Sequence, residues 1–229
     1  MKKKRLNLNV VLVEPNGPLN VGSIARLCSN FDVNELRIVS PKCDIFSLEA
    51  KKMALKGYKY IDNCKIFNSI EQAIFDCDLV IATCGRIDLS NDIECESPED
   101  ISKWISSFVE INNLGILFGR EDRGLSNNEL LFAHKILNIE TSQSYPSLNL
   151  SHAVSIILYE LNKSSTNNLK KDLQVFDLAS SKQIYESFKE IEEMLMKTGY
   201  LLEHTANSKI SKFKKFLLKA KTSSHDINV

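Results

Sequence analysis

The alternation of short apolar runs and helical patterns over the first 160 residues constrains the fold of this chain more than any other feature. Apolar runs that end at turn residues predict strands at 8–13, 36–39, 64–67, 79–83, 115–118 and 135–139. Helical spacing predicts helices at 21–30, 46–55, 70–75, 101–109 and 150–162, and one that starts at the capping pattern of Ser126 and Glu129. Repeated strand-then-helix units bury both faces of one sheet. We therefore expect an α/β fold, with a mainly parallel sheet flanked by helices.

Charge is balanced over the whole chain and uneven along it. The 229 residues include 29 basic and 29 acidic side chains, so any nucleic-acid surface must be local. Residues 163–229 hold 12 lysines against 8 acids. Residues 163–180 are rich in Ser, Asn and Lys, which is typical of a linker, and helical spacing resumes after them. We expect a domain over 1–162, a linker over 163–180 and a basic helical extension over 181–229.

The cysteines and histidines predict neither a disulfide framework nor a metal site. Six cysteines are scattered without a Cys-x-x-Cys pair, and the four histidines have no partners at ligand spacing. No apolar stretch approaches the roughly 20 residues that a membrane span needs. The apolar run near the N-terminus stops at Glu14-Pro15 and lacks a small-residue cleavage site. We expect a cytoplasmic protein with no metal and no membrane contact.

Three segments carry residues that could do chemistry. The first, Asn-Val-Gly-Ser-Ile-Ala-Arg at 20–26, follows the first predicted strand, where Asn20 could cap a helix. Ligands of open α/β sheets bind outside the carboxyl ends of the strands. An ordinary helix start with a surface arginine at Arg26 explains the segment equally well. The G-x-G-x-x-G dinucleotide fingerprint is absent, which argues against a dehydrogenase.

The second segment runs from a buried strand into four consecutive charges at 120–123, between Gly119 and Gly124. The two glycines permit a close approach of the backbone to a ligand, although a solvated turn would need the same residues. The third segment, at 145–153, opens an apolar helix with Pro-Ser-Leu-Asn. Ser147 or Asn149 could cap this helix, or the turn could present backbone amides and carbonyls to a polar cofactor.

Together, the three segments resemble the SPOUT methyltransferases, specifically the SpoU branch of RNA ribose 2′-O-methyltransferases. The motifs are NVGSIAR at 20–26, ILFGREDRGLSNNEL at 116–130 and YPSLNLSHAVSIILYEL at 145–161, within a match over about 8–162. The opening VLVEP and the tail after Lys197 are similar to a tRNA-modifying subgroup that acts in the anticodon loop, although the tail here is short. The resemblance implies a C-terminal trefoil knot. Ribosomal RNA or another tRNA site is the alternative substrate, and a non-catalytic RNA-binding protein is the alternative class.

The resemblance also implies a bound methyl donor, S-adenosylmethionine, which is consumed as a cosubstrate without a metal. Three loops of the family build its pocket. They match, in this chain, Ala82, Thr83, Cys84, Gly85, Leu117, Gly119, Ile139, Pro146, Ser147 and Leu148. Backbone groups of these loops would read the edge of the adenine, and apolar side chains would cover its faces.

Catalytic roles carried over from the family fall on Arg26, Asn20, Glu121, Ser147 and Asn149. Asn20 would orient Arg26 or the ribose, and Glu121 would accept a hydrogen bond from substrate or arginine. Arg26 would either activate the ribose hydroxyl as a base or hold the adjoining phosphate as a charged clamp. An arginine of pKa about 12.5–13.8 is neutral at pH 7 in only about one part in a million, which favours the clamp.

Partners implied by the resemblance are tRNA and a second copy of the chain, because sites in this family form across a homodimer. The apolar helix at 153–161, with Val154, Ile157, Leu158 and Leu161, would supply the contact or belong to the core. Phosphate contacts would come from Arg26, Lys209, Lys212, Lys214 and Lys215. A solvated helix that docks only its apolar side explains the four lysines equally well.

Overall fold

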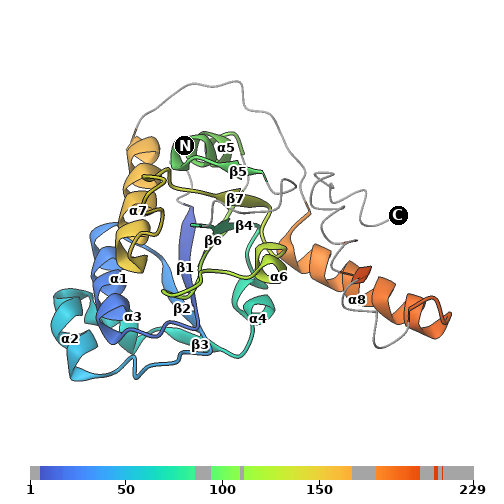
Figure 1. Cartoon of the computed structure of the whole chain (residues 1–229), viewed down its shortest axis with the longest axis horizontal. Coiled ribbons are helices and arrows are strands. Elements are labelled where there is room, and N and C mark those ends of the chain that lie inside the picture. Colours follow the sequence, from blue (N-terminus) through green and yellow to red (C-terminus); the bar gives the residue numbers. More distant parts are fainter. Residues whose placement is uncertain are drawn as a thin grey trace.

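A seven-stranded parallel sheet forms the centre of the molecule in the computed structural model (Figure 1). The structure describes residues 6–85, 94–108, 111–166, 179–201, 209, 210 and 213. The sheet order is β3-β2-β1-β6-β4-β7-β5, and every neighbouring pair is parallel. The strands are β1 (Asn7–Val13), β2 (Glu35–Val39), β3 (Lys65–Phe67), β4 (Leu79–Thr83), β5 (Cys95–Glu96), β6 (Asn113–Phe118) and β7 (Lys135–Leu137). The predicted fold class is confirmed.

Alternate residues of the central strands feed two apolar layers. Val10 and Leu12 of β1 face one layer, and Val11 and Val13 face the other. All four are buried, as expected for a strand that is covered on both sides. The strand therefore reads as a continuous apolar run rather than as an alternating one.

Helices cover both faces of the sheet (Figure 1). The first layer contains α1 (Pro18–Asn30), α2 (Leu48–Ala54), the 3₁₀ turn η1 (Leu55–Tyr58), α3 (Lys59–Asp62), α5 (Pro98–Ser106) and α7 (Leu150–Thr166). The opposite layer contains α4 (Ile70–Ile74) and α6 (Asn127–Leu130), and α8 (Ser181–Lys197) packs beside them. None of the described helices is long and apolar enough to span a membrane.

Several element boundaries differ from the sequence prediction. Helix α1 begins at Pro18 after Gly17, so Asn20 lies inside the first turn and the predicted Asn20 cap is wrong. Proline at the first helical position has a backbone dihedral already suited to a helix, which explains the early start. Helix α5 likewise starts at Pro98, capped by Ser97. Helix α7 reaches Thr166, four residues beyond its predicted end and into the predicted linker.

Helix α8 is attached to the sheet domain through His134. The Nδ1 atom of His134 accepts a hydrogen bond from Val80 N at 3.0 Å, and its Nε2 lies 3.0 Å from the carbonyl oxygen of Ala179. Burial lowers the pKa of this imidazole. The neutral ring, with its proton on Nε2, satisfies both contacts and ties the start of α8 to β4.

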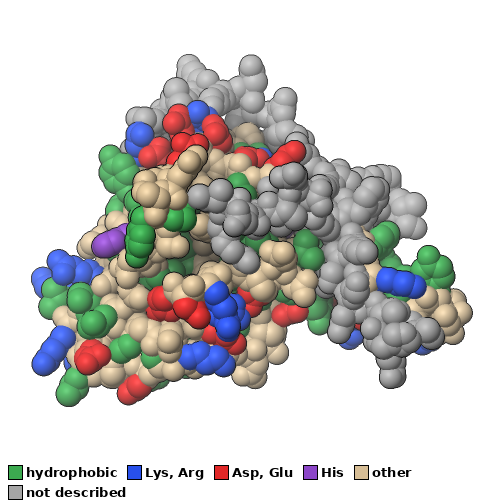
Figure 2. Space-filling view, viewed as in Figure 1, with side chains coloured by type: hydrophobic (Ala, Val, Ile, Leu, Met, Phe, Trp, Pro, Cys, Tyr) green, Lys and Arg blue, Asp and Glu red, His purple; other side chains and the backbone are tan. Residues whose placement is uncertain are grey.

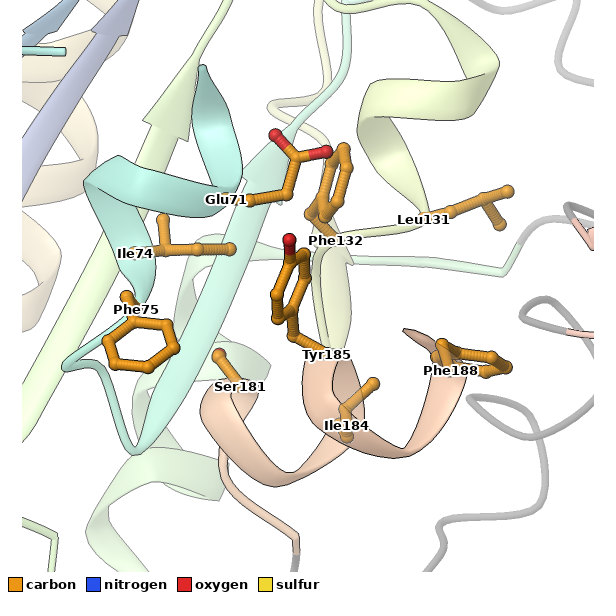
Figure 3. Close-up of a pocket in the computed structure, with 9 residues that line it drawn as sticks. All are labelled: Glu71, Ile74, Phe75, Leu131, Phe132, Ser181, Ile184, Tyr185 and Phe188. Atoms are coloured by element: carbon orange, nitrogen blue, oxygen red, sulfur yellow. The ribbon is translucent and has the colours of Figure 1, made fainter. Parts of the chain in front are cut away.

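A small apolar pocket lies where α8 meets the domain (Figure 3). Its walls come from α4, from the segment after α6 and from α8, including Phe75, Phe132 and Tyr185. This face of the sheet lies opposite α1 and α7. The pocket is therefore a feature of helix docking, on the opposite face of the sheet from the first and third motifs and next to the end of the second motif at Leu130.

Candidate functional site

The carboxyl ends of β6, β4 and β7 lie side by side, because the three strands are parallel neighbours. Thr83 Oγ1 donates to the carbonyl oxygen of Leu117 at 3.0 Å, and the backbone N–H of Cys84 donates to Leu137 at 2.9 Å. The side chain of Asn138 donates to the carbonyl of Cys84 at 2.6 Å. The loops predicted to hold the methyl donor therefore begin at one edge of the sheet.

The side chains at this edge divide into a buried set and an open set. Ala82, Cys84 and Leu117 are buried in the core. Gly85 is exposed, and a Cβ added to it would meet no atom within 4 Å, so open space adjoins the loop. Ile139 is half-buried against the first layer.

The loop before α7 contributes the remaining predicted cofactor residues. Thr141 Oγ1 donates to the carbonyl oxygen of Pro146 at 2.9 Å, which closes the loop on itself. Ser147 and Leu148, which follow, are exposed. These side chains are thus available to a ligand, and no described contact ties them to the other two loops.

The turn after β6 is tightly folded. A Cβ on Gly119 would lie 2.2 Å from the carbonyl carbon of Gly124 and 2.3 Å from the nitrogen of Leu125. Gly124 has a φ of +66°, in the left-handed region that favours glycine, and its N–H donates to Arg120 O at 2.9 Å. Both glycines are therefore required by the backbone geometry.

Arg120 connects this turn to α6 and to the end of β1 through hydrogen bonds. The sequence analysis did not predict this role. Its Nη1 and Nη2 each lie 2.9 Å from the Glu129 carboxylate of α6, and its Nε lies 2.6 Å from Glu14 at the end of β1. Glu14 has a φ of 47°, which is strained for a residue with a side chain. The Arg120 hydrogen bond lowers the pKa of Glu14. Burial raises the pKa of Glu129, but hydrogen bonds from Arg120 and Ser126 outweigh it, so the net shift is downward.

Glu121, the next residue, joins the first and second motifs. Its carboxylate accepts backbone hydrogen bonds from Asn16 and Gly17, both at 3.0 Å, and one from Asn20 Nδ2 at 3.1 Å. Three donors hold this carboxylate in place and satisfy most of its accepting capacity. The arrangement suits a group that fixes the loop before α1 more than one that removes a proton.

Asn149 brings in the third motif. Its Nδ2 donates to Asn20 Oδ1 at 3.0 Å, so Asn149, Asn20 and Glu121 form one hydrogen-bonded chain. Its Oδ1 accepts from the backbone N–H of Ser151 at 2.8 Å, which caps α7. The predicted cap is thus confirmed for Asn149, and the same side chain also contacts Asn20 of the first motif.

Arg26 does not join this chain of side chains within one molecule. Six residues along α1 from Asn20 correspond to about 9 Å of helix and to a different side of it. The Arg26 side chain is exposed and makes no hydrogen bond or ion pair with any residue that the structure describes. Of the five predicted catalytic residues, three are thus connected, while Arg26 and Ser147 are presented to solvent.

Of the two alternatives for the apolar residues of α7, core or dimer contact, the core is confirmed for three of them, and the predicted RNA surface lies partly outside the described residues. Val154, Ile157 and Leu158 are buried in the core, so the exposed side of α7 is formed instead by His152, Ile156 and Tyr159. Lys209 is exposed, with Nζ 5.2 Å from the ring centroid of Tyr200 after α8. Lys212, Lys214 and Lys215 lie outside the described residues. Within the described ranges, no group of three or more His, Cys, Asp or Glu side chains could hold a metal ion, and all six cysteines are free thiols.

Comparison with known proteins identifies the family. Residues 7–159 match the model of the SpoU rRNA Methylase family. A relative from Methanocaldococcus jannaschii, named tRNA (cytidine-2'-O-)-methyltransferase TrmJ, is 38% identical over 198 residues, covering 86% of this chain and 85% of that protein. The crystal structure of TrmJ from Z. mobilis has a TM-score of 0.82 at 26% identity, covering 96% of this chain and 94% of that one. The SpoU methyltransferase AviRb from Streptomyces viridochromogenes, solved in complex with the cofactor AdoMet, has the same fold, with a TM-score of 0.56 and 19% identity, covering 70% of this chain and 59% of that one.

Proposed function

The chain belongs to the SpoU methylase family, and from that premise we propose that it is an S-adenosylmethionine-dependent tRNA ribose 2′-O-methyltransferase. The site it modifies would be a pyrimidine nucleotide of the anticodon loop. The observation that carries this proposal is the hydrogen-bonded chain Asn149–Asn20–Glu121, which unites one residue from each motif. The choice of tRNA as the substrate is supported by the relative that is 38% identical, whose name specifies a tRNA cytidine 2′-O-methyltransferase.

The residues at the sheet edge fit the methyl donor. The open space beside Gly85 follows Cys84, whose backbone N–H already donates to Leu137 and whose carbonyl oxygen keeps one lone pair that could accept from the edge of an adenine. Ile139 and the exposed Leu148 offer apolar surface for its faces. Once bound, S-adenosylmethionine would supply the methyl group: a bond from the ribose 2′-oxygen to the methyl carbon would form as the carbon–sulfur bond breaks to leave a neutral thioether, and the hydroxyl proton would pass to water.

The protein's part in this reaction is orientation and charge. Alignment of two reactants is worth up to about 7–11 kcal/mol in favourable cases. The Asn149–Asn20–Glu121 chain holds the start of α1 against the start of α7, and under this proposal the ribose and the methyl donor would be aligned beside it. The charged Arg26 would hold the phosphate next to the target ribose and stabilise the oxyanion that develops as the hydroxyl loses its proton.

We propose a homodimer in which a second copy delivers its Arg26 to this site. The support is that Arg26 is exposed and outside the Asn149–Asn20–Glu121 chain in a single molecule. The exposed side of α7, with Ile156 and Tyr159, offers an apolar surface for the contact. The trefoil knot, the division at 1–162, 163–180 and 181–229, and a cytoplasmic location belong to the same proposal.

The decisive experiment maps ribose methylation by mass spectrometry in tRNA and ribosomal RNA from cells with and without this protein. We expect one anticodon-loop pyrimidine to lose its 2′-O-methyl group in the cells without the protein. Purified protein with S-adenosylmethionine should restore the mark on that tRNA. A change confined to ribosomal RNA would instead show that ribosomal RNA is the substrate. If calorimetry detects no binding of S-adenosylmethionine, a non-catalytic RNA-binding protein is favoured.

A further inference from the structure

The surface around α2, η1 and α3 carries four exposed lysines that the sequence analysis did not connect with function. They are Lys51, Lys52, Lys56 and Lys59. Only two acids, Glu49 and Asp62, fall within residues 48–62. Figure 2 shows blue side chains along its lower left edge, where Figure 1 places α1 and α2. We call these four lysines the α2 lysine surface.

These lysines differ from the others of the sheet domain in being unpaired. None of the four forms an ion pair with a residue that the structure describes. Every other lysine described within residues 6–166 is paired with a carboxylate; these are Lys42, Lys65, Lys103, Lys135 and Lys163. The charge of the α2 lysine surface is therefore available to an external anion.

Aromatic rings position two of these ammonium groups. Lys51 Nζ lies 5.2 Å from the ring centroid of Tyr58, and Lys59 Nζ lies 5.4 Å from that of Tyr60. The hydroxyl of Tyr60 donates to the carbonyl of Val33 at 2.7 Å, which fixes that ring. An aromatic ring has no net charge, so it leaves the positive charge of the ammonium group without the opposing negative charge that a carboxylate would supply.

The α2 lysine surface is held directly against the helix that carries Arg26. A Cβ on Gly57 would lie 2.6 Å from the Cα of Arg26, so the backbone of η1 touches α1 at that residue. A Cβ on Gly22 would lie 2.4 Å from the carbonyl oxygen of Ala50, so α1 and α2 are equally close. Arg26, which is exposed and has no ion pair with a described residue, adds a further positive charge beside the α2 lysine surface.

We propose that Lys51, Lys52, Lys56 and Lys59 bind backbone phosphates of the tRNA and present its target nucleotide to Arg26. This inference rests on the proposed function and adds the surface that docks the substrate. It differs from the predicted lysine surface near 209, because α8 packs on the opposite face of the sheet from α1 and α2. Lysines in such positions supply sequence-independent, salt-sensitive affinity.

The test compares two matched quadruple variants of the full chain. One carries Lys51→Gln, Lys52→Gln, Lys56→Gln and Lys59→Gln; the control carries Lys65→Gln, Lys103→Gln, Lys163→Gln and Lys182→Gln, four ion-paired lysines of similar exposure. We expect Kd for tRNA to rise at least tenfold in the first and less than twofold in the control. The slope of log affinity against log salt should become shallower by about 3 if all four contact phosphates. KM for tRNA should rise, with kcat at saturating tRNA and affinity for S-adenosylmethionine unchanged.

Other outcomes separate this inference from the proposed function. If the wild-type protein methylates tRNA and the first variant binds tRNA as tightly as the control, the inference is overturned while the function stands. If the wild-type protein binds S-adenosylmethionine and leaves tRNA unmethylated, both fail. A first variant that loses its dimer mass in sedimentation, at unchanged tRNA affinity, would assign the surface to a protein contact instead. The double variant Lys52→Glu, Lys56→Glu repeats the measurement with reversed charge and should weaken tRNA binding further than the two matching Gln changes.

Discussion

The side-chain amide of Asn149 donates to the side-chain carbonyl of Asn20 at 3.0 Å, across 129 residues of sequence. The same Asn149 caps α7 through its Oδ1 atom. An Asn149→Asp variant keeps an oxygen for the cap and replaces the amide donor with a second oxygen. We expect a methylation rate lower by about a hundredfold, the scale of a 1 Å misplacement of reacting groups. Thermal unfolding should change little, because Asp caps helices as well as Asn.

The matched variant Asn149→Ala removes both contacts at this position. It should lose activity to the same degree and, in addition, about 1 kcal/mol of stability from the lost cap. Steady-state kinetics and thermal melts of the two proteins measure this difference. Full activity in Asn149→Asp would mean that the contact to Asn20 has no part in catalysis.

The contribution of Arg120 to stability can be measured by using the neighbouring Arg123 as a control. An Arg120→Met variant removes the guanidinium that donates to the partly buried carboxylates of both Glu14 and Glu129. We expect a loss of about 1.5–3 kcal/mol, measured by urea unfolding, together with weaker binding of S-adenosylmethionine. Arg123 is 67% exposed and lies 3.8 Å from Glu14, so Arg123→Met should cost less than about 1 kcal/mol. An equal loss of unfolding free energy in the two variants would contradict the structural role assigned to Arg120.

The same cluster makes stability depend on pH on the acid side. The folded state lowers the pKa of both Glu14 and Glu129. The two carboxylates therefore stabilise the folded state fully above the pKa of an unfolded glutamate, about 4.3. This stabilisation is lost as pH falls through the lower pKa values that Glu14 and Glu129 have in the folded state. Thermal melts between pH 6 and 3 should show the melting temperature falling below about pH 4.5. In Arg120→Met this fall should be smaller, because the main cause of both downward shifts is gone.

Substitutions at two glycines of the predicted methyl-donor loops should distinguish an effect on folding from an effect on methyl-donor binding. Gly119→Ala forces a Cβ to within 2.3 Å of backbone atoms of Gly124 and Leu125, so we expect loss of stability and of methyl-donor binding together. Gly85→Ala meets only open space and should leave the melting temperature unchanged. If Gly85 adjoins the bound methyl donor, the added methyl group should weaken its affinity in calorimetry. Unaltered affinity in Gly85→Ala would remove this loop from the predicted pocket.

The sequence predicted six of the seven strands, since each apolar run ends at a turn residue. Because the strands are parallel, their carboxyl ends meet at one edge, and the loops predicted to hold the methyl donor begin there. The two-residue strand β5 was out of reach, because only its pairing with β7 defines it. Contacts over long separations were equally hidden. The Arg120–Glu14 pair spans 106 residues, and nothing in the local pattern marks it.

Two features could not be predicted from residue type alone. Asn20 is a good capping residue by type, yet Pro18 starts α1 earlier and frees the Asn20 side chain for Glu121 and Asn149. The α2 lysines look like an ordinary solvated helix face in sequence. They are distinguished by having no ion pair with a described residue and by lying on a segment whose backbone, at Gly57, contacts Arg26.

The proposed delivery of Arg26 by a second copy can be tested by mixing two inactive variants. Arg26→Lys should lose most activity while remaining folded, because lysine lacks the planar fork that holds a phosphate. Asn149→Asp should be nearly inactive for the reason given above. If each site combines Arg26 of one copy with Asn149 of the other, a mixed dimer has one intact site. Random exchange of subunits in an equimolar mixture should then restore about a quarter of wild-type activity. A mixture that stays inactive, with mixed dimers verified by mass spectrometry, would place Arg26 and Asn149 in the same chain's site.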